Sequence, residues 1–200
     1  FMITFSLFSA LLAYYFTMFV TPGPNNTMLT ASGMKFGFYK TLPHLIGISL
    51  GHVFQISLTC FGLVNIFILY PQIQIYMNVL CFLYLIFLSW KMIGSFTVGR
   101  SETGRPLKLY EASLFQFINP KAWSIAITVA SGFFPSDESI IIGVIFVSLT
   151  AALINFPSIC LWALFGNTLK IYATNKKIKK IIEYILALLL VLTALFILIK

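Results

Sequence analysis

The sequence predicts an all-α integral membrane protein with six transmembrane helices, arranged as two inverted three-helix repeats in which helices one and four are broken. Three observations support this fold class. Hydrophobic residues make up 60% of the 200 residues and charged residues only 9%, a balance far from that of water-soluble domains. Six apolar stretches follow one another along the chain, and one longer polar linker divides them into two equal halves.

Each apolar stretch can supply most of the roughly 20 residues that cross a hydrocarbon core of about 30 Å. In chain order the stretches are residues 3–20, 42–69, 73–92, 113–134, 140–165 and 181–199. We expect a single transmembrane domain over residues 1–200, with pseudo-repeats 1–95 and 110–200 joined by a cytoplasmic loop. Because each half crosses three times, the second half enters from the opposite side, as an inverted repeat requires.

The formal charge of +8 comes from thirteen Lys and Arg residues, which gather in alternate loops. These are the loops after the first, third and fifth stretches, whereas the loop around residues 70–72 has none and residues 135–139 carry only Asp137 and Glu138. We expect a multi-pass protein of the inner (plasma) membrane, and the positive-inside rule predicts cytoplasmic basic loops with both termini outside. No nucleic-acid partner is needed to explain the charge. Residues 176–180 are a topology signal alone or, as the alternative, also contact anionic lipid headgroups.

The segment TPGPNNTML, residues 21–29, interrupts the first span. Pro22 and Pro24 each remove a helix hydrogen bond, and Gly23 relaxes the backbone between them. The freed backbone groups must face protein or a water-filled cavity, because each unsatisfied group in lipid costs several kcal/mol. The helix that resumes presents an N-terminus with a partial positive charge, for which Asn25 and Asn26 are predicted caps.

The segment NPK repeats this pattern in the fourth span. Asn119 is the predicted cap, Pro120 the first helical residue, and Lys121 adds a full positive charge. Counting from the cytoplasmic side at about 1.5 Å per residue puts Asn25 about 15 Å and Lys121 about 12 Å into the bilayer. We therefore expect two helix N-termini to converge near the midplane at a site suited to a carboxylate, with simple packing kinks as the alternative.

The motif TPGPNNTML, the glycines that follow it and QFINPKAW at residues 116–123 together resemble the LysE/RhtB family of amino acid exporters, over essentially the whole chain. The segments TPGPNN, GISLGH at 47–52 and CLWALFG at 160–166 are most similar to its cysteine and O-acetylserine exporter branch. The resemblance implies a transporter and no enzyme or cofactor. It also implies export of an amino acid or close metabolite from the cytoplasm, driven by the proton gradient.

Other polar residues inside the spans complete the predicted site. His52 is the candidate for taking up and releasing the coupling proton, with a structural hydrogen bond to a neighbouring helix as the alternative. The predicted substrate-binding residues are Asn25, Asn26, Asn119, Lys121 and Asn155. Gly47 and Gly51 form a small-xxx-small pair that should let another helix approach closely.

No Asp or Glu lies deep in a span, since Glu111 and Glu183 sit at span ends. A basic substrate would need a buried carboxylate to offset its extra charge. We therefore expect a neutral substrate moved by alternating access, and the resemblance implies cysteine or O-acetylserine as examples.

Two other function classes are the alternatives to a transporter. A thiol-redox relay would use Cys60 and Cys160, which lack a CxxC context, and no cysteine has the spacing of a metal site. A non-transporting scaffold has no need for polar residues at mid-depth. A homo-oligomeric assembly stays open.

Overall fold

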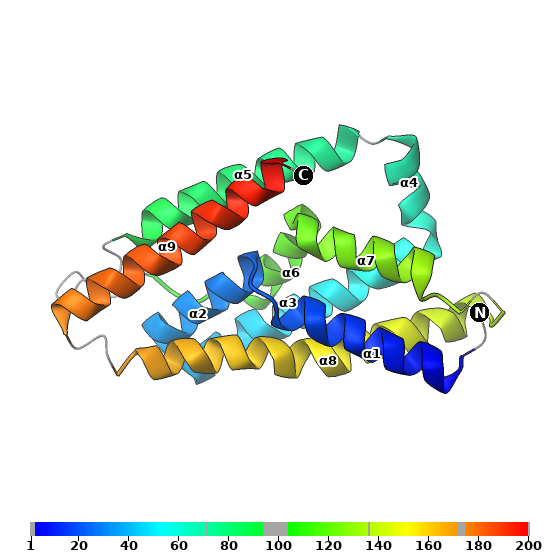
Figure 1. Cartoon of the computed structure of the whole chain (residues 1–200), viewed down its shortest axis with the longest axis horizontal. Coiled ribbons are helices and arrows are strands. Elements are labelled where there is room, and N and C mark those ends of the chain that lie inside the picture. The colour runs from blue at the N-terminus through cyan, green and yellow to red at the C-terminus, as the bar shows by residue number, and fades with distance from the viewer. Residues whose placement is uncertain (1–2, 71, 94–103, 136, 172–174, 200) are drawn as a thin grey trace.

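The computed structural model describes residues 3–70, 72–93, 104–135, 137–171 and 175–199, and every regular element in these ranges is helical. The elements follow the predicted spans in order (Figure 1). They are α1 (Phe5–Val20), α2 (Pro24–Phe36), α3 (Phe38–Leu58), the π-helical segment η1 (Thr59–Leu63), α4 (Val64–Leu69), α5 (Gln72–Met92), α6 (Leu109–Ile118), α7 (Pro120–Gly132), α8 (Ile140–Leu169) and α9 (Lys176–Ile199).

The described helices have the length and surface of membrane spans. Three are long and apolar enough to cross a bilayer, namely Phe38–Leu63, Ile140–Leu169 and Lys177–Ile197, and α1 with α2 qualifies as one span bent by 55°. Large apolar side chains such as Phe5, Leu69 and Trp90 are more than two-thirds exposed, which suits lipid rather than water. The chain is therefore a multi-pass membrane protein, and six spans in two repeats stay a prediction.

Both predicted breaks fall between helices. Pro22 and Gly23 lie between α1 and α2, and Asn119 lies between α6 and α7, where its Oδ1 accepts a hydrogen bond from the Lys121 amide at 3.1 Å. Asn119 is thus confirmed as a cap. The prediction that Asn25 and its neighbour cap the other helix was wrong: Gly23 is the N-cap residue, because Pro24 already begins α2 and places both asparagines in its first turn.

The second predicted span, residues 42–69, is less regular than its sequence indicated. After α3 the chain passes through η1 into α4, and Gly62 there has φ of 115°. A residue with a side chain is strained in that conformation, so the glycine permits the change of direction. Nothing in the apolar pattern of this stretch distinguished it from a continuous helix.

Glycines set the closest helix contacts. A methyl group at Gly47 would collide with the Leu109 carbonyl of α6, and one at Gly51 would meet the backbone of Ser113. The prediction that this glycine pair admits another helix is confirmed, and that helix is α6. Gly166 likewise allows close contact between α8 and α2, since a methyl group there would collide with the Thr30 carbonyl.

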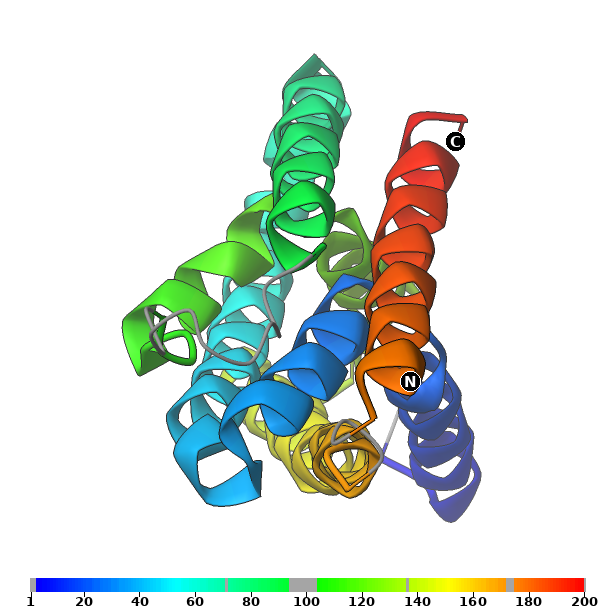
Figure 2. The same ribbon diagram turned by 90° about the vertical axis from the view of Figure 1, so that its left-hand side faces the viewer.

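Three apolar clusters hold the bundle together. The first joins α1, α3, α7 and α8, the second joins α2, α5, α6 and α9, and the third joins α2, α3, α6 and α8. Helices α5 and α9 pack along each other, away from α1 and α8 (Figures 1 and 2). Cys60, Cys81 and Cys160 belong to three different clusters.

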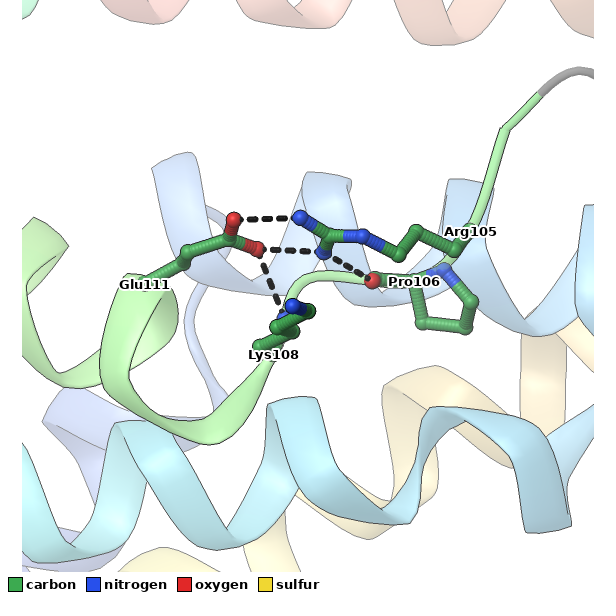
Figure 3. A network of polar contacts seen from close by, with 4 residues as sticks. All are labelled: Arg105, Pro106, Lys108 and Glu111. Carbon is green, nitrogen blue, oxygen red and sulfur yellow. Dashed lines mark hydrogen bonds and ion pairs between the residues drawn. The ribbon is translucent and has the colours of Figure 1, made fainter.

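An ion pair anchors the start of α6 (Figure 3). The two carboxylate oxygens of Glu111 each accept a hydrogen bond from the Arg105 guanidinium at 2.6 Å, and one also accepts from the Lys108 amide at 2.8 Å. Arg105 and then the Lys108 amide hold the pKa of Glu111 at about 2, below its ordinary value of 4.5. This contact fixes the entry to the second half of the chain. Most of the predicted linker before it, residues 94–103, lies outside the described residues.

Candidate functional site

The C-terminal end of α1 exposes carbonyl groups that the break has freed, and side chains from other elements bind them. Asn26 Nδ2 donates to the carbonyls of Phe19 and Thr21, both at 2.8 Å. Trp162 Nε1, from α8, donates to the Val20 carbonyl at 3.1 Å. The expectation that these groups must find partners inside the protein is met here by side chains.

Lys121 reaches from the start of α7 to the same helix end. Its Nζ donates to the Thr21 carbonyl at 2.9 Å, to the Thr21 hydroxyl at 2.8 Å and to the Pro22 carbonyl at 3.2 Å. The two helix breaks therefore contact each other directly. A cation at this position also interacts favourably with the partial negative charge of a helix C-terminus.

Amide side chains link the start of α2 and helix α3 to the end of α6. Asn25 Nδ2 donates to Gln116 Oε1 at 2.8 Å, and Gln116 Nε2 returns a longer bond to Asn25 Oδ1 at 3.3 Å. Gln55 Nε2 donates to the Gln116 carbonyl at 3.1 Å, which ties α3 to the end of α6. The break between α1 and α2 is thus held against the break between α6 and α7 by paired amides as well as by the lysine.

The six predicted polar residues surround one small cavity. Its volume is about 20 Å³, enough for about one water molecule. The six residues in its wall are Asn25, Asn26, His52, Asn119, Lys121 and Asn155.

Two of these residues come from helices without a break. His52 is 3% exposed and its ring packs edge-on against Phe19 at 5.3 Å between centroids. Its Nδ1 has no hydrogen-bond partner among the described residues. Asn155 Oδ1 accepts a hydrogen bond from Ser49 at 2.7 Å, which joins α8 to α3.

A larger cavity of about 470 Å³ adjoins the small one, within the range of about 300–1,000 Å³ that small-molecule sites occupy. Lys121, Gly23 and Pro24 line both cavities. None of the described residues in the larger wall is acidic. The site therefore presents one cation, backbone groups and a mixed apolar and polar wall.

Sequence reasoning missed part of this wall. Asn78 of α5 and Thr193 and Phe196 of α9 line the larger cavity. Asn78 was visible as a polar residue within a predicted span, but nothing in its surroundings placed it near a break. The acceptor role of Thr21 was also missed; its carbonyl is free because α1 ends at Val20 and Thr21 is the C-cap residue.

The described residues offer no group of three or more His, Cys, Asp or Glu side chains that could hold a metal ion. The chemistry available is binding, by one ammonium group, amide side chains and helix ends.

A multi-pass helical bundle whose broken helices meet at a polar cavity has the architecture of a membrane transporter. The comparison with known families agrees. The model of the LysE type translocator family matches residues 16–200, and the chain belongs to this family. Membership of a translocator family makes the chain a transporter rather than an enzyme.

Named relatives extend the match along almost the whole chain. A protein of Salmonella typhimurium (strain LT2) named "Cysteine/O-acetylserine efflux protein" is 30% identical over 190 residues, 94% of this chain and 95% of its own length. A protein of Escherichia coli (strain K12) with the same name is 28% identical over 191 residues, 94% and 96% of the two chains. The predicted resemblance to this family and branch is confirmed. No solved structure gives a significant match.

Proposed function

We propose that the chain exports a neutral amino acid or a close metabolite, such as cysteine or O-acetylserine, from the cytoplasm by alternating access. The observation that carries this proposal is the position of Lys121, whose ammonium group lies where the two helix breaks meet and whose side chain lines both cavities. A lone cation beside helix ends suits a single carboxylate. The names of the similar proteins support the same substrate class.

The wall of the larger cavity favours a neutral over a basic substrate. A lysine or arginine substrate would bring a second positive charge, and none of the described lining residues is an acidic residue that could offset it. Met18 and Met77 also line the cavity. Their flexible thioethers adapt to small substrate side chains of different shape.

The position of the breaks supports the repeat architecture. Near the start of each proposed repeat, 1–95 and 110–200, a helix is interrupted by a proline-containing segment, and the two interruptions contact each other. Alternating access would then be a rocking of one half against the other around this contact. In the proposed topology both termini lie outside and the Lys- and Arg-rich loops lie in the cytoplasm.

Proton coupling is assigned to His52 in this proposal. The imidazole shares the small cavity with Lys121, and its Nδ1 lacks a hydrogen-bond partner among the described residues. A water molecule in the small cavity would connect the His52 imidazole to the substrate site by hydrogen bonds. We expect His52→Gln to leave efflux that no longer responds to an imposed pH gradient; a response equal to that of the wild type would assign coupling elsewhere.

Efflux of radiolabelled amino acids from loaded vesicles tests the transport proposal, with and without a proton gradient. We expect Lys121→Ala to stop efflux while the protein still migrates as a folded species. Lys108→Ala is the matched control, because Lys108 is exposed at the start of α6 and lines neither cavity. Unchanged efflux in Lys121→Ala would remove the lysine from the mechanism.

No structural observation favours the thiol-redox alternative. Its candidate cysteines, Cys60 and Cys160, pack in separate apolar clusters. Replacement of all three cysteines by alanine should leave efflux intact, whereas its loss would restore the alternative. The scaffold alternative predicts no substrate-dependent flux at all.

A further inference from the structure

The ammonium group of Lys121 lies on three oxygens, two backbone carbonyls and one hydroxyl. We propose that the carbonyl groups of Thr21 and Pro22, with the Thr21 hydroxyl, form the site for the α-ammonium group of the transported amino acid, and that Lys121 holds this site when no substrate is bound. The inference rests on the proposed function only in naming an amino acid as the ligand.

The number of acceptors and their distances from Nζ match a primary ammonium group. An ammonium group has three N–H donors and no acceptor, and Lys121 Nζ lies 2.8, 2.9 and 3.2 Å from the three oxygens. All three belong to the C-cap residue Thr21 and to Pro22 after it, just past the C-terminal end of α1, where the helix dipole favours a cation. None of the described residues lining the cavity is acidic, so neutral oxygens are the acceptors that this wall offers to a cation.

The acceptors are held in place and reachable. Asn26 Nδ2 fixes the Thr21 carbonyl through a second hydrogen bond at 2.8 Å, independent of the lysine. Thr21 and Pro22 are exposed and line the larger cavity, so a ligand in that cavity meets them directly. A Cβ at Gly23 would lie 3.0 Å from Lys121 Cδ and 3.2 Å from Nζ; the glycine leaves room for the lysine side chain to lie across the break.

A zwitterion can exchange places with the lysine without leaving any group unpaired. Its α-ammonium takes over the three oxygens, and the displaced Lys121 ammonium pairs with the neighbouring carboxylate of the same molecule. The net charge of the site is unchanged, because an amino acid with a neutral side chain carries no net charge. A molecule without the α-amino group gains only the carboxylate contact, so the site discriminates amino acids from simple acids.

The first test uses a small ammonium ion on purified, detergent-solubilised protein. Lys121→Ala vacates the three oxygens, and we expect ethylammonium chloride to raise its unfolding midpoint by about 3–6 °C at ten times the dissociation constant. Tetramethylammonium, which has the same charge and no N–H, should not do so, and neither salt should act specifically on the wild type. Equal effects of both salts on both proteins would overturn the proposal.

The second test compares L-cysteine with 3-mercaptopropionate, which lacks the α-amino group, by their effect on the same unfolding midpoint. Thr21→Val keeps the shape of the side chain and removes the hydroxyl, which is one acceptor of the proposed site and also donates to the Met18 carbonyl at 3.0 Å. We expect about a tenfold or greater loss of L-cysteine affinity with that of the analogue unchanged. Thr21→Ser, which keeps the hydroxyl, should behave as the wild type. Equal losses for both ligands would make Thr21 a structural residue and overturn the proposal.

The two experiments separate this inference from the proposed function. If neither L-cysteine nor any other amino acid binds, but ethylammonium still rescues Lys121→Ala, the amino acid assignment fails and the ammonium site stands. If amino acids bind and are exported while ethylammonium rescues nothing, the exporter stands and the ammonium site fails.

Discussion

Replacement of Asn26 by leucine should destabilise the protein by removing the donor that binds the end of α1. The two side chains have the same branched shape, but leucine leaves the Phe19 carbonyl without the only side-chain donor that the described residues give it. A buried carbonyl left unpaired costs about 1–3 kcal/mol. The Thr21 carbonyl keeps its bond from Lys121 and loses only about 0.5–1.5 kcal/mol. The sum is about 1.5–4.5 kcal/mol.

For a chain of this size that loss lowers the unfolding midpoint by roughly 5–15 °C, measured by thermal unfolding in one detergent at one pH. Asn78→Leu is the matched control, because it makes the same chemical change in a half-buried cavity residue whose side chain has no hydrogen bond to the described residues. We expect the control to change the midpoint by less than about 2 °C. Equal midpoints for the two variants would refute the idea that this amide satisfies the break.

Three further outcomes follow from the contacts described above. Gly166→Ala should lower the unfolding midpoint through overpacking of about 1–3 kcal/mol, whereas Gly132→Ala, where a methyl group meets nothing within 4 Å, should not; equal midpoints would contradict the close helix contact. Trp162→Phe keeps an aromatic ring but removes the donor to the α1 end, so it should unfold at a lower temperature than the wild type, and an unchanged midpoint would count against that bond. The pKa of Glu111 is depressed to about 2, so its stabilising contribution is present above pH 4.5 and is lost as the pH falls towards 2; the midpoint difference between wild type and Glu111→Gln should shrink over that window, and a constant difference would contradict it.

The sequence predicted the places where helices break, because the effect of a proline on the backbone is local and does not depend on which helices meet. Pro22 and Pro120 act through a missing N–H and a fixed φ, and the helix boundaries fall beside them. The glycine pair at Gly47 and Gly51 was equally readable, because the spacing alone puts both on one helix face. Gly62 was not, since a lone glycine in an apolar run says nothing about its φ.

Partners of side chains could not be predicted in the same way, because they depend on which helices meet. Asn26 was expected to cap its own helix and instead caps the end of α1. Lys121 was expected to face a substrate carboxylate, and in this structure its ammonium lies on carbonyls of a helix a hundred residues away. Residue type and position next to a proline were visible in the sequence, whereas the identity of the acceptor was a property of the tertiary contact between the breaks.

The contact between the breaks also bears on how binding would be linked to motion. Lys121 begins α7 in the second half of the chain, while its three acceptors end α1 in the first half. Any movement of one half against the other must stretch or remake these bonds, and a half-buried ammonium that loses its acceptors is left less well satisfied. A zwitterion that supplies both an ammonium for the carbonyls and a carboxylate for the lysine keeps every group paired while the direct bond opens. Substrate occupancy and the relative position of the halves would then be coupled through a single side chain.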